Sequence, residues 1–380
     1  MSNDRFIEAI KDLFRINLGV RKEERVLVFT DEIMPEERIT PEDRNRRGRL
    51  KDLARLVAEV GKGLCKEVVY TEYKALMSHG AEPPEKVWRM AFGGKTVKAL
   101  KELKVMKALI DKRAGDEQIR KAEDIISKYR KNTIDVVVGL SNYSTSHTRF
   151  RDFITRAAGA RYASMPLFDP DMLFGAMTVD WRDLERRTKD LAGKVNKALR
   201  IEVSTPNGTE LSFSKEGRKT GSDTGILRKP GSFGNLPAGE VYLAPLEGTS
   251  EGKLIVEWAP THRLKYTVDL TVRKGKVVEV EGRDSYRSVL EKKLSENDNF
   301  RNIAELGIGT NDKATRPDNI LESEKILGTI HIALGDNSSF GGKIRTPFHQ
   351  DFIFFRPTLR LVYHNKKEAV ILKDGRLRSL

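Results

Sequence analysis

Arg25-Val-Leu-Val-Phe-Thr30 is the stretch that decides the fold expected for the first half of the chain. The run is too short for a helix and rich in apolar and β-branched residues, which predicts a buried strand. Similar runs occupy residues 66–71 and 134–140, and the segments between them have helical spacing, as in residues 49–57. This alternation predicts an α/β domain with a parallel sheet. No GxGxxG or Walker loop follows these strands, so the sequence does not support nucleotide binding.

The pattern changes near residue 197, where short strands joined by tight turns begin. The first of these turns, Asn207-Gly208, is typical of a β-hairpin. Further strand patterns follow over residues 254–258, 266–272 and 277–280, and helical patterns over residues 286–294 and 320–327. We therefore predict two domains: an α/β domain over residues 1–196, and an α+β domain over residues 197–380 that is rich in antiparallel strands and carries a metal site.

Histidines and carboxylates gather on the strands expected late in this second domain. Successive residues of a strand point to opposite faces, so His349 and Asp351 share one face while the phenylalanines beside them occupy the other. The same reading places His331 opposite large apolar neighbours, on a face shared with alanine and glycine. Glu305 and Glu240 also lie on the face opposite the expected core. Each strand therefore presents a candidate metal ligand.

These two histidines and three carboxylates are enough for two divalent ions that share a carboxylate. Zinc, cobalt and manganese accept mixed imidazole and carboxylate ligands, and such a pair activates a water molecule for hydrolysis. Glu240 or Glu305 is the candidate catalytic base. Taken singly, each residue also has a simpler interpretation: an exposed strand glutamate, a core histidine, or an ordinary His–Asp hydrogen bond. The prediction rests on the joint pattern.

The composition limits the classes of function. The chain of 380 residues has one cysteine, Cys65, which excludes an internal disulfide or a thiolate zinc cluster and is typical of a reducing compartment. With no signal-peptide pattern and no apolar run of about 20 residues, we expect a cytoplasmic protein without a membrane partner.

The net charge of +14 leaves a nucleic-acid-binding protein with a vestigial site as a third interpretation, but acidic residues interleave with the basic ones and no RNA-binding motif is present. We therefore expect no nucleic-acid partner. Abundant Lys, Arg and Glu with only two Gln suggest a thermophile.

Four segments around these ligands resemble the aminopeptidase T family of thermophilic metallopeptidases: residues 235–241, 304–311, 328–335 and 349–351. Residues 146–149 and 163–166 resemble that family's first domain more weakly. The resemblance implies a metallo-aminopeptidase, a hydrolase that removes N-terminal residues from a peptide substrate with water activated by two zinc, cobalt or manganese ions. It also implies a homodimer. The implied metal ligands are Glu240, Glu305, His331, His349 and Asp351, with Glu305 as the bridging carboxylate.

One residue of that family is missing from this chain. The family places a catalytic tyrosine a few residues beyond the first ligand histidine, whereas residues 336–340 contain none. Asn337 offers an alternative donor to an oxyanion, or is simply a loop residue beside glycines.

An oxidoreductase is the second interpretation. The same fold resembles 2,5-dihydroxypyridine 5,6-dioxygenase, which uses one iron(II) held by two histidines and one aspartate. His331, His349 and Asp351 would form this triad, with iron(II) as the cofactor of a mononuclear ring-cleaving dioxygenase. Glu240 and Glu305 would then be spectators or substrate contacts.

Overall fold

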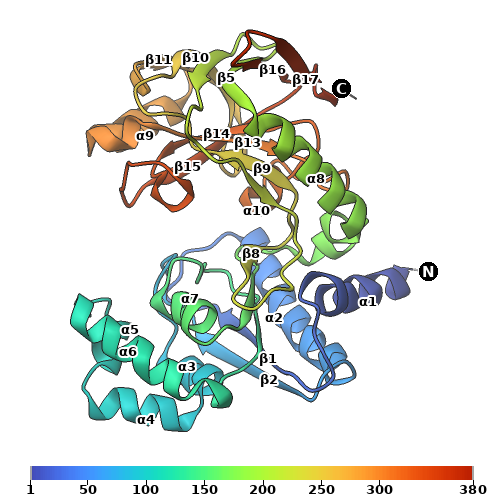
Figure 1. Cartoon of the computed structure of the whole chain (residues 1–380), viewed down its shortest axis with the longest axis vertical. Helices are drawn as coiled ribbons and strands as arrows, with labels where there is room; N and C mark the ends of the chain where they lie inside the picture. The colour runs from blue at the N-terminus through green and yellow to red at the C-terminus, as the bar shows by residue number, and fades with distance from the viewer. Residues whose placement is uncertain (1, 379–380) are drawn as a thin grey trace. The chain divides into compact units, whose positions relative to one another are not determined.

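The computed structural model describes residues 2–378 and divides the chain into two compact units (Figure 1). Unit 1 contains residues up to 178 together with residues 225–237, and unit 2 contains residues 179–224 and those from 238 onward. The division differs from the boundary expected at residue 196. Helix α8 (Trp181–Asn196) belongs to unit 2, whereas strand β8 (Phe233–Asn235) returns to unit 1 because it pairs with β4 (Arg161–Ser164).

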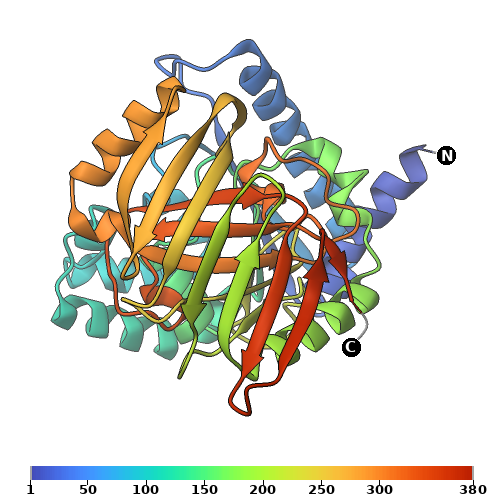
Figure 2. The ribbon, with the colours of Figure 1, turned by 90° about the horizontal axis from the view of Figure 1, so that it is seen from above.

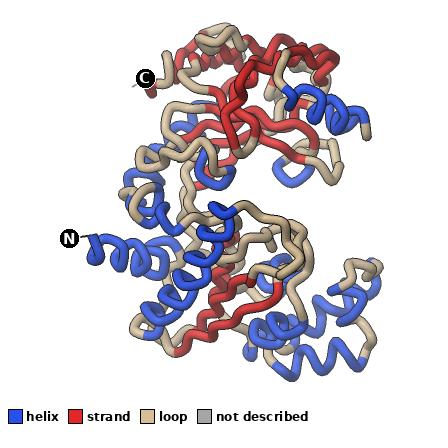
Figure 3. Tube along the Cα trace, turned by 180° about the vertical axis from the view of Figure 1, so that it is seen from behind, coloured by secondary structure: helices blue, strands red, loops and turns tan. Residues whose placement is uncertain are grey.

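Unit 1 is an α/β layer with a parallel sheet, as the alternating pattern predicts. Its five strands lie in the order β2-β1-β3-β4-β8, and all neighbours run parallel. The three predicted runs form β1 (Arg25–Glu32), β2 (Glu67–Lys74) and β3 (Val136–Gly139). Figure 3 shows these strands among helices. The helices are α1 (Ser2–Asp12), α2 (Pro41–Lys62), α3 (Glu85–Phe92), α4 (Gly94–Glu102), α5 (Met106–Ile110), α6 (Asp116–Lys128) and α7 (Arg149–Asp152).

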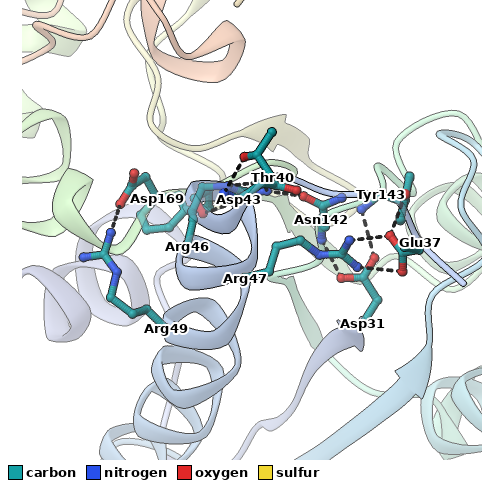
Figure 4. Close-up of polar contacts among 11 residues, drawn as sticks. Asp31, Glu37, Thr40, Asp43, Arg46, Arg47, Arg49, Asn142, Tyr143 and Asp169 are labelled. Atoms are coloured by element: carbon teal, nitrogen blue, oxygen red, sulfur yellow. Dashed lines mark hydrogen bonds and ion pairs between the residues drawn. The ribbon is translucent and has the colours of Figure 1, made fainter. Parts of the chain in front are cut away.

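The strand order of unit 1 reverses between β1 and β3, where sheets of this kind often bind ligands beyond the carboxyl ends of their strands. Here the chain's own polar groups bond to one another at that place (Figure 4). Asp31 accepts hydrogen bonds from the backbone N–H groups of Asn142, at 2.6 Å, and Tyr143, at 2.9 Å. Glu37 forms a buried ion pair with Arg47 and accepts a hydrogen bond from the Tyr143 hydroxyl. This network agrees with the absence of a phosphate-binding loop.

Unit 2 contains two antiparallel sheets that pack face to face, and Figure 2 shows that their strands cross. The larger sheet has the order β12 (Lys276–Gly282), β11 (His262–Arg273), β10 (Glu251–Ala259), β6 (Glu210–Ser214), β5 (Ala198–Ser204), β16 (Thr358–Tyr363), β17 (Glu368–Lys373) and β18 (Arg376–Leu377). The smaller sheet has the order β15 (His349–Phe354), β14 (Ile330–Gly335), β13 (Ile303–Gly309), β9 (Glu240–Leu243) and β7 (Gly221–Asp223). The predicted hairpin around Asn207-Gly208 is present as β5 and β6.

Of the two helices predicted in unit 2, one has the expected length and the other is shorter. Helix α9 (Ser285–Ser295) matches the expected segment closely. Helix α10 (Ile320–Ser323) ends before Lys325, and the backbone carbonyl of Lys325 instead accepts a hydrogen bond from Asn311. No helix in the described part of the chain is both long and apolar enough to cross a membrane.

Candidate metal centre

The five candidate ligands lie on four neighbouring strands of the smaller sheet. Glu240 begins β9, Glu305 lies in β13, His331 in β14, and both His349 and Asp351 in β15. Residues that alternate with them, including Val241, Leu306, Ile332 and Phe352, belong to the apolar core between the two sheets. The structure therefore brings all five side chains to the face of the sheet that points away from this core.

Small residues lie between these side chains across the strands. Gly307 pairs with His331, and Ala333 pairs with Glu305 on one side and with Asp351 on the other. A Cβ atom at position 307 would lie 1.9 Å from Cε1 of His331, so the imidazole ring occupies the space of a side chain there. The glycine is required for the ring to lie flat across its strand.

The imidazole of His331 is surrounded by carboxylates. Its Nε2 lies 3.5 Å from Glu240 Oε2, 3.6 Å from Glu305 Oε1 and 4.0 Å from Asp351 Oδ1. Two ligand atoms that are each about 2.1 Å from one ion lie roughly 3.0–3.4 Å apart. Glu240 Oε2 is buried and has no hydrogen-bond partner among the residues described. The shorter of these separations are close to those of atoms that share a cation and too long for good hydrogen bonds.

His349 approaches the same carboxylates from the edge strand. Its Nε2 lies 3.4 Å from Glu305 Oε2 and 3.5 Å from Asp351 Oδ1. Its Nδ1 lies 2.8 Å from the backbone oxygen of Asp336, and because a carbonyl oxygen can only accept, Nδ1 carries the proton. This hydrogen bond orients the ring and leaves Nε2 available as a ligand.

Two sets of donors result from this arrangement. The ligand atoms of Glu240, Glu305 and His331 lie within 4.8 Å of one another, and so do those of Glu305, His349 and Asp351. Glu305 is common to both sets, whereas Asp351 Oδ1 lies within 4.0 Å of both histidine Nε2 atoms. The two sets fit a pair of ions that share Glu305. The two histidines together with Asp351 supply the donor types of a single-iron site.

Lys325 is a charged residue of the centre that the sequence reading missed. Its Nζ donates to Glu240 Oε1 at 2.6 Å and to Glu324 Oε2 at 2.7 Å, and its side chain is 1% exposed. Burial lowers the pKa of Lys325, but the two glutamates outweigh burial and hold it well above its ordinary value. The ammonium group is therefore charged. The available signal was a lysine among apolar residues in the segment that leads to strand β14.

The metal-free centre holds protons tightly. Burial lowers the pKa of both histidines, but the carboxylates around them outweigh it and raise the pKa of His331 to about 9 and that of His349 to about 10. Burial also raises the pKa of Glu240 to about 7. Burial acts to raise the pKa of Asp351 as well, but His349 outweighs it and holds that pKa below its ordinary value. Both imidazoles are consequently protonated at neutral pH until a cation replaces the protons.

Asn337 does not have the free amide that an oxyanion donor needs. It is fully buried, its Nδ2 donates to Glu247 at 3.0 Å, and its Oδ1 accepts from the backbone of Ile344 at 2.9 Å. The oxyanion role considered from the sequence is therefore wrong, and Asn337 instead holds the loop between β14 and β15.

Aromatic rings line the centre beside that loop. The Phe340 ring meets the Tyr242 ring edge to face at 5.9 Å, and it meets the His349 ring in the same way at 6.1 Å. Tyr242 lies two residues after Glu240 on β9 and thus on the same face of the sheet. The only sequence signal for its placement was this spacing.

The fold and these side chains define a candidate metalloprotein of the mixed imidazole and carboxylate class. A family model described as 2,5-dihydroxypyridine 5,6-dioxygenase (NicX) matches residues 93–378, and the chain belongs to this family. A comparison with curated proteins gives no match.

Two solved structures share the fold. The 2,5-dihydroxypyridine dioxygenase from Pseudomonas putida KT2440 is 17% identical with a TM-score of 0.68, and the alignment covers 100% of this chain and 99% of that one. AmpT from Thermus thermophilus is 15% identical with a TM-score of 0.60, with 99% and 100% of the two chains covered.

The aminopeptidase interpretation was therefore wrong. The fold-level similarity to both proteins is confirmed, but the family match is to a dioxygenase, an oxidoreductase, and gives no support to a hydrolase or protease. The error has a chemical reason, since first-row metals in hydrolases and in oxygenases use the same imidazole and carboxylate ligands.

Proposed function

We propose that this chain is a mononuclear non-haem iron dioxygenase that cleaves the ring of a hydroxylated aromatic substrate, with His331, His349 and Asp351 as the iron ligands. The family match supports the reaction class. The observation that carries the ligand set is the position of Asp351 Oδ1, 3.5 Å from one imidazole Nε2 and 4.0 Å from the other. Bound iron(II) would activate dioxygen for the reaction, because amino-acid side chains alone cannot do so.

The remaining carboxylates are proposed as substrate contacts. Glu240 Oε2 and the oxygens of Glu305 face the same space as the imidazoles and are able to accept hydrogen bonds from substrate hydroxyl groups. Lys325 holds the other oxygen of Glu240 at 2.6 Å, so this acceptor keeps one orientation. Tyr242 and Phe340 offer aromatic surface beside them for a flat ring.

Metal analysis of anaerobically purified protein, followed by an oxygen-uptake assay with 2,5-dihydroxypyridine, tests this proposal. We expect about one iron per chain, and we expect oxygen uptake to match the loss of the aromatic absorbance. His349→Ala should abolish both iron binding and oxygen uptake, whereas His364→Ala, at an exposed turn, should change neither. Two zinc or cobalt ions per chain without oxygen uptake would contradict the proposal.

Two further expectations remain predictions. The lone cysteine, Cys65, supports a cytoplasmic location. The homodimer is implied only by the sequence resemblance to the aminopeptidase T family. The mass of the purified protein in solution, measured by light scattering, tests the second.

A further inference from the structure

A pocket of about 500 Å³ lies between helix α9 and the edge strand β15 of the smaller sheet. This volume is within the range of small-molecule sites in proteins. The pocket borders the metal centre because one wall includes His349. Its lining residues are Tyr286, Val289, Leu290, Lys292, Lys293, Glu296, Pro347, Phe348, His349 and Gln350.

The walls of this pocket contain both apolar and charged side chains, and part of the apolar surface is exposed. Helix α9 turns Tyr286, Val289, Leu290 and Lys293 toward β15, at the three- and four-residue spacing of one helical face. Leu290 is buried, but Val289 is 61% exposed, which is unusual for a valine beside a core. Phe348 also lines the pocket, but it is buried, and the ammonium group of Lys293 lies 5.9 Å from the centre of its ring. The exposed side chain of Val289 therefore offers the apolar surface for a ligand.

The charge of the pocket is positive. Lys293 is paired with Glu296 at 2.6 Å and lies over the ring of Phe300. Lys292, by contrast, forms neither a hydrogen bond nor an ion pair with any residue in the described part of the chain. The exposed ammonium group of Lys292 is therefore available to a ligand, and a carboxylate is the complementary group.

We propose that this pocket binds a small aromatic carboxylate, with its ring against Val289 and its carboxylate on Lys292. The ligand would lie beside His349 but would not enter the metal site between the imidazoles of His331 and His349. Binding therefore requires no metal ion, and the proposal goes beyond the ring-cleavage reaction.

Calorimetric titration of the metal-free, full-length protein with benzoate and with benzamide tests the proposal. The two probes have the same ring and differ in charge. We expect benzoate to bind about tenfold more tightly than benzamide, because Lys292 is otherwise unneutralised. Lys292→Met should remove this preference. Lys367→Met, which removes the same charge at an exposed turn between β16 and β17, should retain it.

A second variant tests the same site without removing Lys292. Val289→Glu places a carboxylate one helical turn before Lys292, where the two side chains can pair. We expect this variant to lose benzoate binding and to retain weak benzamide binding, and the exposure of Val289 makes the substitution compatible with folding. Equal affinity of the wild type for both probes, or wild-type benzoate affinity in both variants, would overturn the proposal. Since the titration uses no iron and no assay of ring cleavage, its outcome is independent of the proposed dioxygenase activity.

Discussion

Gly307 and His331 lie opposite each other on neighbouring strands, and the imidazole of His331 occupies the space that a side chain at position 307 would fill. A Cβ atom there would lie 1.9 Å from the ring. Gly307→Ala should therefore displace the ring and lower iron affinity at least about tenfold, since misplaced ligands bind metals poorly. Competition with a coloured chelator measures this affinity. Gly193→Ala, on helix α8 with open space around it, should leave iron affinity unchanged.

Metal binding should release protons and strengthen as the pH rises. In the metal-free protein the pKa is about 9 for His331 and about 10 for His349, so both imidazoles are protonated at pH 7. An ion must displace these protons, and its apparent affinity should therefore increase from pH 7 until the pH exceeds both values. Calorimetry in buffers of different ionisation enthalpy counts the protons released. An affinity that stays constant between pH 7 and 9 would contradict this assignment.

Lys325→Met should strongly destabilise the metal-free protein. The substitution leaves the buried Glu240 and the partly buried Glu324 without their cation, and removing one partner of a buried ion pair costs about 3–5 kcal/mol. Denaturant unfolding measures this loss. Lys189→Met provides the matched control, because its pair with Glu185 lies on the surface of α8 and contributes less than about 1 kcal/mol.

Asn337→Ala should loosen the loop between β14 and β15. The amide of Asn337 bonds to Glu247 and to the backbone of Ile344, and the substitution leaves both groups without this partner. We expect trypsin to cleave faster after Lys343 and Arg345, as followed by mass spectrometry. Asn365→Ala, at an exposed turn, should leave the cleavage rate at these two sites unchanged.

The parts of the structure that follow from local pattern could be predicted from the sequence. The run beginning at Arg25 forms the predicted strand, and period-two spacing correctly places His349 and Asp351 on one face of β15. Long-range contacts have no such signal. Strand β8 is only three residues long and joins a sheet formed far earlier in the chain, so its place in unit 1 could not be read locally. The position of Lys325 likewise depends on the early end of helix α10 at Ser323. The helical spacing of residues 320–327 did not predict this early end.

The reaction could not be predicted from the ligand residues. His331 and its carboxylate neighbours are donors that iron, zinc and cobalt all accept, so the residues alone do not distinguish oxygen chemistry from hydrolysis. The choice came from the family match over residues 93–378.

The buried ammonium of Lys325 gives the carboxylate cluster a permanent counter-ion. Unlike a metal, this positive charge cannot dissociate, be oxidised or be removed by a chelator. When the centre is empty, the cluster still retains part of its charge balance, and the sheet that carries it remains supported. We therefore expect the protein to release and rebind a metal ion without unfolding.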